Sequence, residues 1–315
     1  MSWLSYSAKR ILISIGVLIG VSVLIFAIVR LVPGDPARII LGQQSTEETY
    51  QAIRQQLGLN LPVWKQYLLW AADIISGDWG RSLITGKSIE SMLVTRYPRS
   101  LQLSIMALVL ALVIAIPIGI ISAINRNSSI DYFSIFFSQF GVSMPSFFLG
   151  LILILVFARY LNVLPPSGYV SPLDDPVSNL KHTILPASTL AIINAAIITR
   201  YLRSEMLEEL SKDYVRTAKA FGHPNRRIVR KYVLRNALIP TTTIIGIQFA
   251  YMMGGLVVIE KVFSFPGVGV LLLDSLITRD YPLIQVSLLA LAGTIIATNL
   301  IIDLAYGWLD PRIRY

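Results

Sequence analysis

The stretch LQLSIMALVLALVIAIPIGIISAI, residues Leu101–Ile124, decides the fold class because none of its 24 side chains is charged. An α-helix rises about 1.5 Å per residue, so roughly 20 apolar residues cross the hydrocarbon core of a bilayer, which is about 30 Å thick. The stretch is long enough and apolar enough to cross it. It therefore predicts a transmembrane helix.

Five further stretches are long and apolar in the same way. They lie near Ile11–Val29, Tyr132–Phe157, Ile184–Leu202, Leu238–Ile259 and Leu283–Tyr306. No small-residue cleavage site follows the first of them, which favours an uncleaved anchor over a signal peptide. We therefore predict an all-α membrane protein with six transmembrane helices.

The composition of the whole chain agrees with this class. Of its 315 residues, 54% are hydrophobic and 14% are charged, and the mean hydropathy is +0.65. Water-soluble domains carry about a quarter charged residues. The net charge of +9 invites a nucleic-acid partner, but the basic residues fall in particular loops without an aromatic-rich patch, so we expect none. The absence of cysteine excludes disulfides, thiolate metal sites and cysteine nucleophiles.

Lysine and arginine are divided unequally between the two sides of the predicted spans. One side carries 14 of them, nine of which lie between Arg203 and Arg235, whereas the other carries Lys181, Lys261 and Arg279. Because basic residues in short loops resist translocation, the first side is predicted to be cytoplasmic. The chain is then a multi-pass protein of the plasma (inner) membrane with both termini in the cytoplasm.

The connection after the first span, Val32–Ser100, has 69 residues, of which seven are basic and six acidic. Loops longer than about 60 residues fall outside the charge rule, so this segment can be extracytoplasmic. Between Pro62 and Ser76 it carries aromatic residues at the spacing of an interfacial helix. The predicted domains are residues 1–31 (tail and first helix), 32–100 (extracytoplasmic segment) and 101–315 (five-helix core, including a cytoplasmic loop at 203–237).

That loop largely coincides with SEMLEELSKDYVRTAKAFGHPNRRIVRKYVLRNALIP, Ser204–Pro240, which is patterned for two amphipathic helices. Gly222 can adopt the left-handed conformation that ends a helix, and Pro224 can begin the next one. The predicted product is a helix, a sharp turn and a short basic helix. An amphipathic hairpin lying on the membrane surface fits the same pattern. The apolar positions are Leu207, Leu210, Tyr214, Ala218 and Phe221, then Ile228, Val229, Tyr232 and Val233.

The loop resembles the EAA motif of ATP-binding-cassette (ABC) importer permeases, through Arg216-Thr217-Ala218, Gly222 and Leu238-Ile239-Pro240. Arg and Thr replace the Glu-Ala of the general motif, and Gly222 lies farther from Pro240 than that motif prescribes. Both departures are usual in the peptide and nickel branch. Six further stretches also resemble that branch, and its B-type permease in particular. They are LVPGDPA at Leu31–Ala37, LGLNLPVWKQYLLW at Leu57–Trp70, GDWGRSL at Gly77–Leu83, SMPSFFLGL at Ser143–Leu151, VFSFPGVGVLLLDSLITRDYPLIQ at Val262–Gln285 and DPRIRY at Asp310–Tyr315.

The resemblance implies a type I ABC importer permease fold and import of di- or oligopeptides by alternating access. It implies a second, C-type permease, two ATPase subunits that hold ATP and magnesium, and an extracytoplasmic substrate-binding protein as partners. This chain itself is expected to hold no cofactor or metal and to be non-catalytic alone. In the family this loop inserts a short coupling helix into a groove of the ATPase. The resemblance therefore implies an ATPase-coupling role for Arg216, Thr217, Ala218, Gly222, His223, Pro224, Arg226 and Arg227.

Two other signals do not support a site on this chain. The sequence GKS at Gly86–Ser88 does not form a phosphate-binding loop motif, because Arg81 occupies the position where the first glycine of that motif is required. His182 and His223 are predicted near opposite membrane faces, without neighbours at ligand spacing, so they cannot form one metal site. The sequence also contains no recognisable hydrolase motif that pairs a nucleophile with a base.

Polar residues inside spans are costly and often functional. Asn194, Gln248 and Asn299 are candidates for the translocation pathway, although such residues also bond helices together. Asp303 is close enough to the cytoplasmic end to meet water or to pair with Arg312.

Three backbone features bear on how the spans pack. Gly16 and Gly20 form a GxxxG spacing that is consistent with close helix packing. Pro117 and Pro145 are expected to bend or start their helices because each lacks a backbone donor.

Three alternatives stay open at this point. The same permease pattern serves nickel or oligosaccharides as cargo. An ATP-independent secondary transporter would show intramembrane carboxylates or an inverted repeat, and neither is visible. A membrane-anchored scaffold would require the loop to bind something other than an ATPase.

Overall fold

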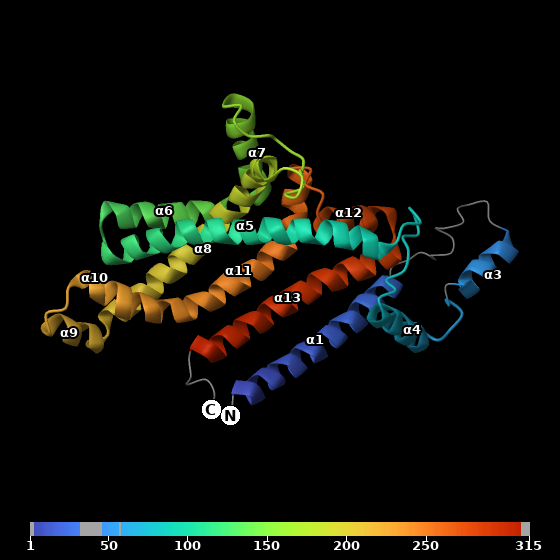
Figure 1. The fold of residues 1–315 in the computed structure, drawn as a ribbon, viewed down its shortest axis with the longest axis horizontal. Coiled ribbons are helices and arrows are strands. Elements are labelled where there is room, and N and C mark those ends of the chain that lie inside the picture. Colours follow the sequence, from blue (N-terminus) through green and yellow to red (C-terminus); the bar gives the residue numbers. More distant parts are fainter. Residues whose placement is uncertain (1–2, 32–45, 57, 310–315) are drawn as a thin grey trace.

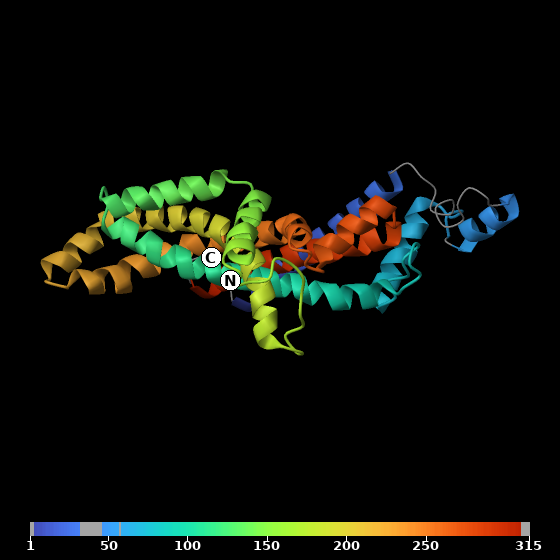
Figure 2. The ribbon, with the colours of Figure 1, turned by 90° about the horizontal axis from the view of Figure 1, so that it is seen from above.

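The computed structural model describes residues 3–31, 46–56 and 58–309 of the chain. These residues are almost entirely helical; within them the single β feature is an isolated bridge between Arg81 and Ser88. Figures 1 and 2 show an elongated bundle with α9 and α10 at one end of the long axis and α3 at the other. The motif at 310–315, most of the motif at 31–37, and Arg312 lie outside the described residues.

The helices differ widely in length, from three to 36 residues. In chain order they are α1 (Trp3–Leu31), α3 (Glu47–Gln56), α4 (Val63–Ser76), α5 (Ile89–Ile124), α6 (Ser129–Ser143), α7 (Ser146–Leu153), the π-helical η1 (Ile154–Tyr160), α8 (Pro176–Ser211), α9 (Asp213–Ala220), α10 (Asn225–Arg227), the π-helical η2 (Ile228–Val233), α11 (Leu234–Val262), α12 (Val268–Thr278) and α13 (Tyr281–Leu309).

Five of the six predicted spans are confirmed as helices long and apolar enough to cross a membrane. The third, predicted at Tyr132–Phe157, is instead split into α6 and the pair α7–η1, which meet at 106°. The sequence Met144-Pro145 causes the break. Proline disfavours a helical conformation in the residue before it, and Met144 is extended with φ −87° and ψ 128°. The six-helix count therefore holds only if this bent pair is one span.

The two prolines singled out from the sequence behave differently. Pro145 directly precedes α7, as a helix-starting proline should. Helix α5 instead continues through both Pro98 and Pro117. Each of these prolines removes one helical hydrogen bond, but the turns of α5 on either side of them remain helical.

Alanines bring α5 and α8 together at the centre of the bundle. Ala107, Ala111 and Ala115 recur every four residues on α5, so they share one face of that helix, and each has an exposed fraction of 0%. The matching residues on α8 are equally buried. Because lipid supplies no hydrophobic force between helices, close contact of small side chains is what stabilises such a pair. The α8 residues are Ala187, Ala191 and Ala195.

Helices α1 and α13 run side by side (Figure 1). Arg10 of α1 forms an ion pair with Asp303 of α13 at 2.9 Å, and Tyr6 donates to the Asp303 carbonyl at 3.3 Å. Asp303 thus has a partner on another helix, which the sequence did not indicate. The packing expected of Gly16 and Gly20 does not occur within the described residues, since a Cβ at either position would meet no atom within 4 Å.

The helix predicted between Pro62 and Ser76 is confirmed as α4, and its interfacial position stays a prediction. Its Tyr67 and Trp70 rings pack against Phe26 of α1, with ring centroids 5.6 Å apart in both pairs. Trp64 of the same helix is 65% exposed. Helix α4 is therefore anchored to α1 through aromatic contacts and also presents apolar surface outward.

A buried carboxylate fixes α12 against α5 and α11. Glu260, at the end of α11, is fully buried, and its carboxylate accepts hydrogen bonds from the Ser100 hydroxyl at 2.5 Å and the Val270 amide at 2.9 Å. Ser100 in turn accepts from the Val268 amide at 2.8 Å. The carboxylate thus satisfies amides in the first turn of α12, which have no partner within that helix. A Cβ at Gly267 would lie 1.9 Å from the Glu260 carboxylate, so glycine is required there.

Candidate functional site

The hairpin between the fourth and fifth spans is the strongest candidate site. Helix α8 continues to Ser211, well beyond the predicted end of its span, and α9 follows directly. After the turn, α10 runs through η2 into α11 as one helix, Asn225–Val262. The predicted short basic helix is therefore not separate; it is the first part of the fifth span. Only residues 212–224 lie between the two long helices.

The turn has the geometry predicted from Gly222 and Pro224. Gly222 has φ +76°, in the left-handed region that suits glycine. Its amide donates to the Lys219 carbonyl at 2.9 Å, and the His223 amide donates to the Ala218 carbonyl at 3.1 Å. This pairing satisfies the last carbonyls of α9. Pro224, with φ −65° and ψ 142°, directly precedes α10.

The inner face of the hairpin packs against the ends of α5 and α8. Val215 of α9 and Ile228 and Val233 of η2 are 0–1% exposed and contact Leu202 and Met206 of α8. The predicted apolar stripes therefore form a core. Two residues of the predicted stripes are not part of this core. Phe221, which follows the last residue of α9, is 79% exposed, and Tyr232 is half-buried with its ring beside that of His223.

A polar cluster holds the base of the hairpin. The Glu209 carboxylate of α8 accepts hydrogen bonds from the Lys212 ammonium and from the Tyr214 hydroxyl, the latter at 2.5 Å. Asn236 of α11 donates to the Tyr214 oxygen at 3.3 Å. Burial, together with the bond to Glu209, raises the pKa of the Tyr214 hydroxyl, so it remains a neutral donor. These contacts join α8, α9 and α11.

The eight residues assigned to coupling divide between the two faces. Arg216, Thr217 and Gly222 are exposed on the outer side of α9 and the turn, and so are Pro224, Arg226 and Arg227 on the other arm. Ala218 is half-buried and packs against the hairpin core. His223 is also half-buried, with its ring 6.3 Å from that of Tyr232. The tip is thus an exposed, largely basic surface on a packed support.

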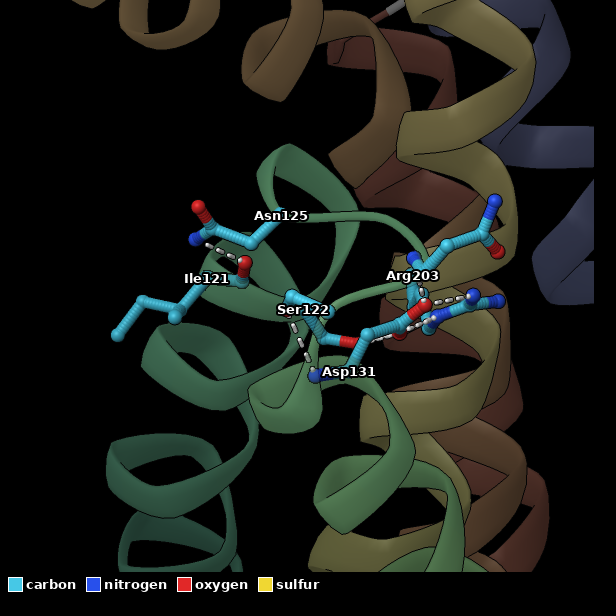
Figure 3. A network of polar contacts seen from close by, with 7 residues as sticks. Ile121, Ser122, Asn125, Asp131 and Arg203 are labelled. Atoms are coloured by element: carbon cyan, nitrogen blue, oxygen red, sulfur yellow. Dashed lines mark hydrogen bonds and ion pairs between the residues drawn. The ribbon is translucent and has the colours of Figure 1, made fainter.

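Asp131 and Arg203 brace the same end of the bundle. Figure 3 shows the Ser122 side chain of α5 and the Arg203 side chain of α8 converging on the Asp131 carboxylate of α6. Ser122 donates at 2.6 Å, and the Asn127 amide donates at 2.9 Å. Asp131 was not among the site residues predicted from the sequence. A signal was present, because Asp131 stands three places after Ser128, a residue type that often caps the start of a helix and does so here.

The three pathway candidates are not brought into one site. Asn194 is 7% exposed, and its amide donates to the Leu190 carbonyl one turn earlier in α8 at 2.7 Å. Gln248 of α11 is 6% exposed. Asn299 of α13 is exposed. No hydrogen bond joins any two of them, and their role stays a prediction.

No group of three potential metal-ligating side chains gathers anywhere in the part of the chain that the structure describes. His182 hydrogen-bonds through Nδ1 to the Ser178 carbonyl at 2.8 Å, which is a local helix contact. His223 lies in the hairpin turn.

Comparisons with known proteins match these features to one family. Residues 115–315 match the model of the binding-protein-dependent transport system inner membrane component, and residues 3–104 match the model of its N-terminal part. The chain belongs to this family. It is therefore a permease subunit of an ABC importer of type I, a multi-pass inner-membrane protein that is not catalytic by itself. Such permeases work with an ATPase that uses ATP and with a substrate-binding protein.

Full-length relatives agree with the family match. The dipeptide transport system permease protein DppB of Alkalihalophilus pseudofirmus is 39% identical, over 99% of this chain and 100% of the relative. A probable peptide ABC transporter permease, y4tP of Sinorhizobium fredii, is 40% identical over 98% and 99%. The glutathione transport system permease protein GsiC of Escherichia coli is 39% identical over 99% of each chain.

Proposed function

We propose that this permease imports di- or oligopeptides. The observation that carries the proposal is that relatives named for dipeptide, peptide and glutathione transport match it along its whole length at 39–40% identity. All three names denote short peptides or peptide transport in general. The scarcity of charged residues within the spans agrees with a pathway that binds cargo weakly and leaves recognition to an external protein.

The hairpin of α9 and α10 is the proposed link to ATP hydrolysis. Its inner face is packed and its outer face is exposed, so a force applied at the tip reaches α8 and α11 through buried contacts. The exposed Phe221 offers an apolar anchor for a groove in the ATPase. The proposed coupling residues are those named from the sequence, Arg216 to Arg227, and we add Phe221 to them.

The proposed assembly contains this chain, a second C-type permease, two ATPase subunits and one extracytoplasmic binding protein. ATP and magnesium are held by the ATPases. The hairpin and both ends of the chain lie on the cytoplasmic side, and residues 32–100 lie outside. This orientation is supported by Figure 1, in which the first turns of α1 and the last turns of α13 lie toward the α9–α10 end. The proposed division into residues 1–31, 32–100 and 101–315 follows from it.

Alternating access is the proposed mechanism, with Asn194, Gln248 and Asn299 lining the pathway in at least one state. Asn194 and Gln248 are buried on two different helices, and a rearrangement of α8 against α11 would alter the surroundings of both.

Uptake by the reconstituted complex tests the proposal. The chain, its second permease, its ATPases and its binding protein are placed in proteoliposomes, and accumulation of a labelled dipeptide is compared with that of Ni²⁺ and of a labelled trisaccharide. Peptide uptake that requires ATP is the expected result. Uptake of nickel or sugar alone would replace the cargo, and uptake driven by an ion gradient without ATP would exclude the ABC mechanism.

A further inference from the structure

A basic concavity lies beside the coupling tip, on the helix that leads into the fifth span. It has a volume of about 590 Å³, and its lining consists of one proline and five cationic side chains. None of the five forms an ion pair within the described residues. The lining residues are Pro224, Arg226, Arg227, Arg230, Lys231 and Arg235.

The opposite face of this helix is firmly packed. Ile228 and Val233 are 0–1% exposed in the hairpin core, so the helix cannot rotate to hide its basic side. Five positive charges within ten residues repel one another, and no described carboxylate forms an ion pair with any of them. Such a surface favours an anionic partner.

The position of the concavity along the helix indicates which anion reaches it. The helix Asn225–Val262 has 38 residues and is about 57 Å long, whereas the hydrocarbon core is about 30 Å thick. Residues 236–259 are free of charge and alone span about 36 Å. Arg235 directly precedes this run. Arg235 therefore lies at the depth where phospholipid phosphates begin, and Lys231 and Arg230 lie about 6–8 Å farther out along the helix.

We propose that this concavity binds the phosphate headgroup of an anionic phospholipid, through Arg230, Lys231 and Arg235 in particular. The proposal rests on α11 crossing the membrane, but not on peptide cargo or on the coupling role of the turn. A headgroup held there would fix the depth of the helix that connects the hairpin to the span.

Binding is measured on the complete transport complex in detergent by native mass spectrometry. The probes are a short-chain phosphatidylglycerol, the matching phosphatidylcholine and inorganic phosphate. The variant is R230Q/K231Q/R235Q. The matched control, K65Q/K87Q/K181Q, removes three exposed charges elsewhere on the chain.

Phosphatidylglycerol is expected to bind wild type and the control alike and to bind the variant at least roughly tenfold more weakly, since three basic residues that attract the anionic headgroup are lost. Equal binding of phosphatidylglycerol to the variant would overturn the proposal. The proposal would also be overturned if wild type bound phosphatidylcholine or free phosphate as tightly as it binds phosphatidylglycerol. Loss of the ATPases from the variant with unchanged lipid binding would assign the surface to the ATPase and leave the proposed function intact.

Discussion

The Arg203 guanidinium donates two hydrogen bonds to the Asp131 carboxylate, from Nε at 2.6 Å and from Nη2 at 2.8 Å. The carboxylate is 1% exposed, whereas the guanidinium side chain is 21% exposed. The pair joins α6 to α8 about two turns before α8 ends at the coupling hairpin. It is therefore placed to keep the support of the hairpin rigid.

Replacing Arg203 by alanine is expected to destabilise the protein strongly. It would leave a buried carboxylate without its charge partner, which costs about 3–5 kcal/mol. Arg10→Ala removes the partner of the more exposed Asp303, and a pair of that kind contributes about 0–1 kcal/mol. Thermal unfolding in detergent should show a much larger fall in Tm for Arg203→Ala than for Arg10→Ala. Equal falls in Tm for the two variants would mean that other groups replace Arg203 as the partner of the Asp131 carboxylate.

Gly222→Val is expected to uncouple ATP hydrolysis from transport. Its Cβ would meet no atom within 4 Å, so the effect comes only from φ +76°, which a β-branched residue disfavours by about 1–3 kcal/mol. Gly80→Val is the matched control, with φ +78° and equally open space in the connection before α5. The measurement is cargo-stimulated ATP hydrolysis and uptake in proteoliposomes. A well-expressed Gly222→Val complex with normal coupling would remove the hairpin from the mechanism.

Gly267→Ala is expected to displace the Glu260 carboxylate and loosen α12. The new methyl group would lie 1.9 Å from Oε1 of Glu260, and overpacking of this kind costs about 1–3 kcal/mol or more. Gly254→Ala on α11 meets no atom within 4 Å and serves as the control. Yield and Tm of the purified proteins give the comparison. If both variants behave like wild type, the buried carboxylate does not fix α12.

Single cysteines test the orientation, because the natural chain has none. Ser129→Cys and Lys212→Cys are at exposed positions near the hairpin end, and Leu173→Cys is 94% exposed in the connection before α8. In intact cells an impermeant maleimide should label Leu173→Cys alone. All three should react once the membrane is permeabilised. Labelling of Lys212→Cys in intact cells would invert the topology.

The sequence by itself determined the class of the protein, five of its spans and the hairpin turn. Lipid requires long uncharged helices, so uncharged length is sufficient to find them. The turn was predictable because φ +76° at Gly222 and the fixed φ of Pro224 are local properties of those two residue types.

Only the tertiary structure decided which small and polar residues are used. Gly16 and Gly20 carry the familiar spacing, yet a Cβ at either would meet no atom of the described residues within 4 Å, whereas the alanines of α5 and α8 form the central contact. Glu260 and Ser100 are 160 residues apart in the chain and meet only in the folded bundle. Spacing tells which side chains share one helix face, but the partner of that face is chosen by packing between helices, and no local pattern encodes that choice.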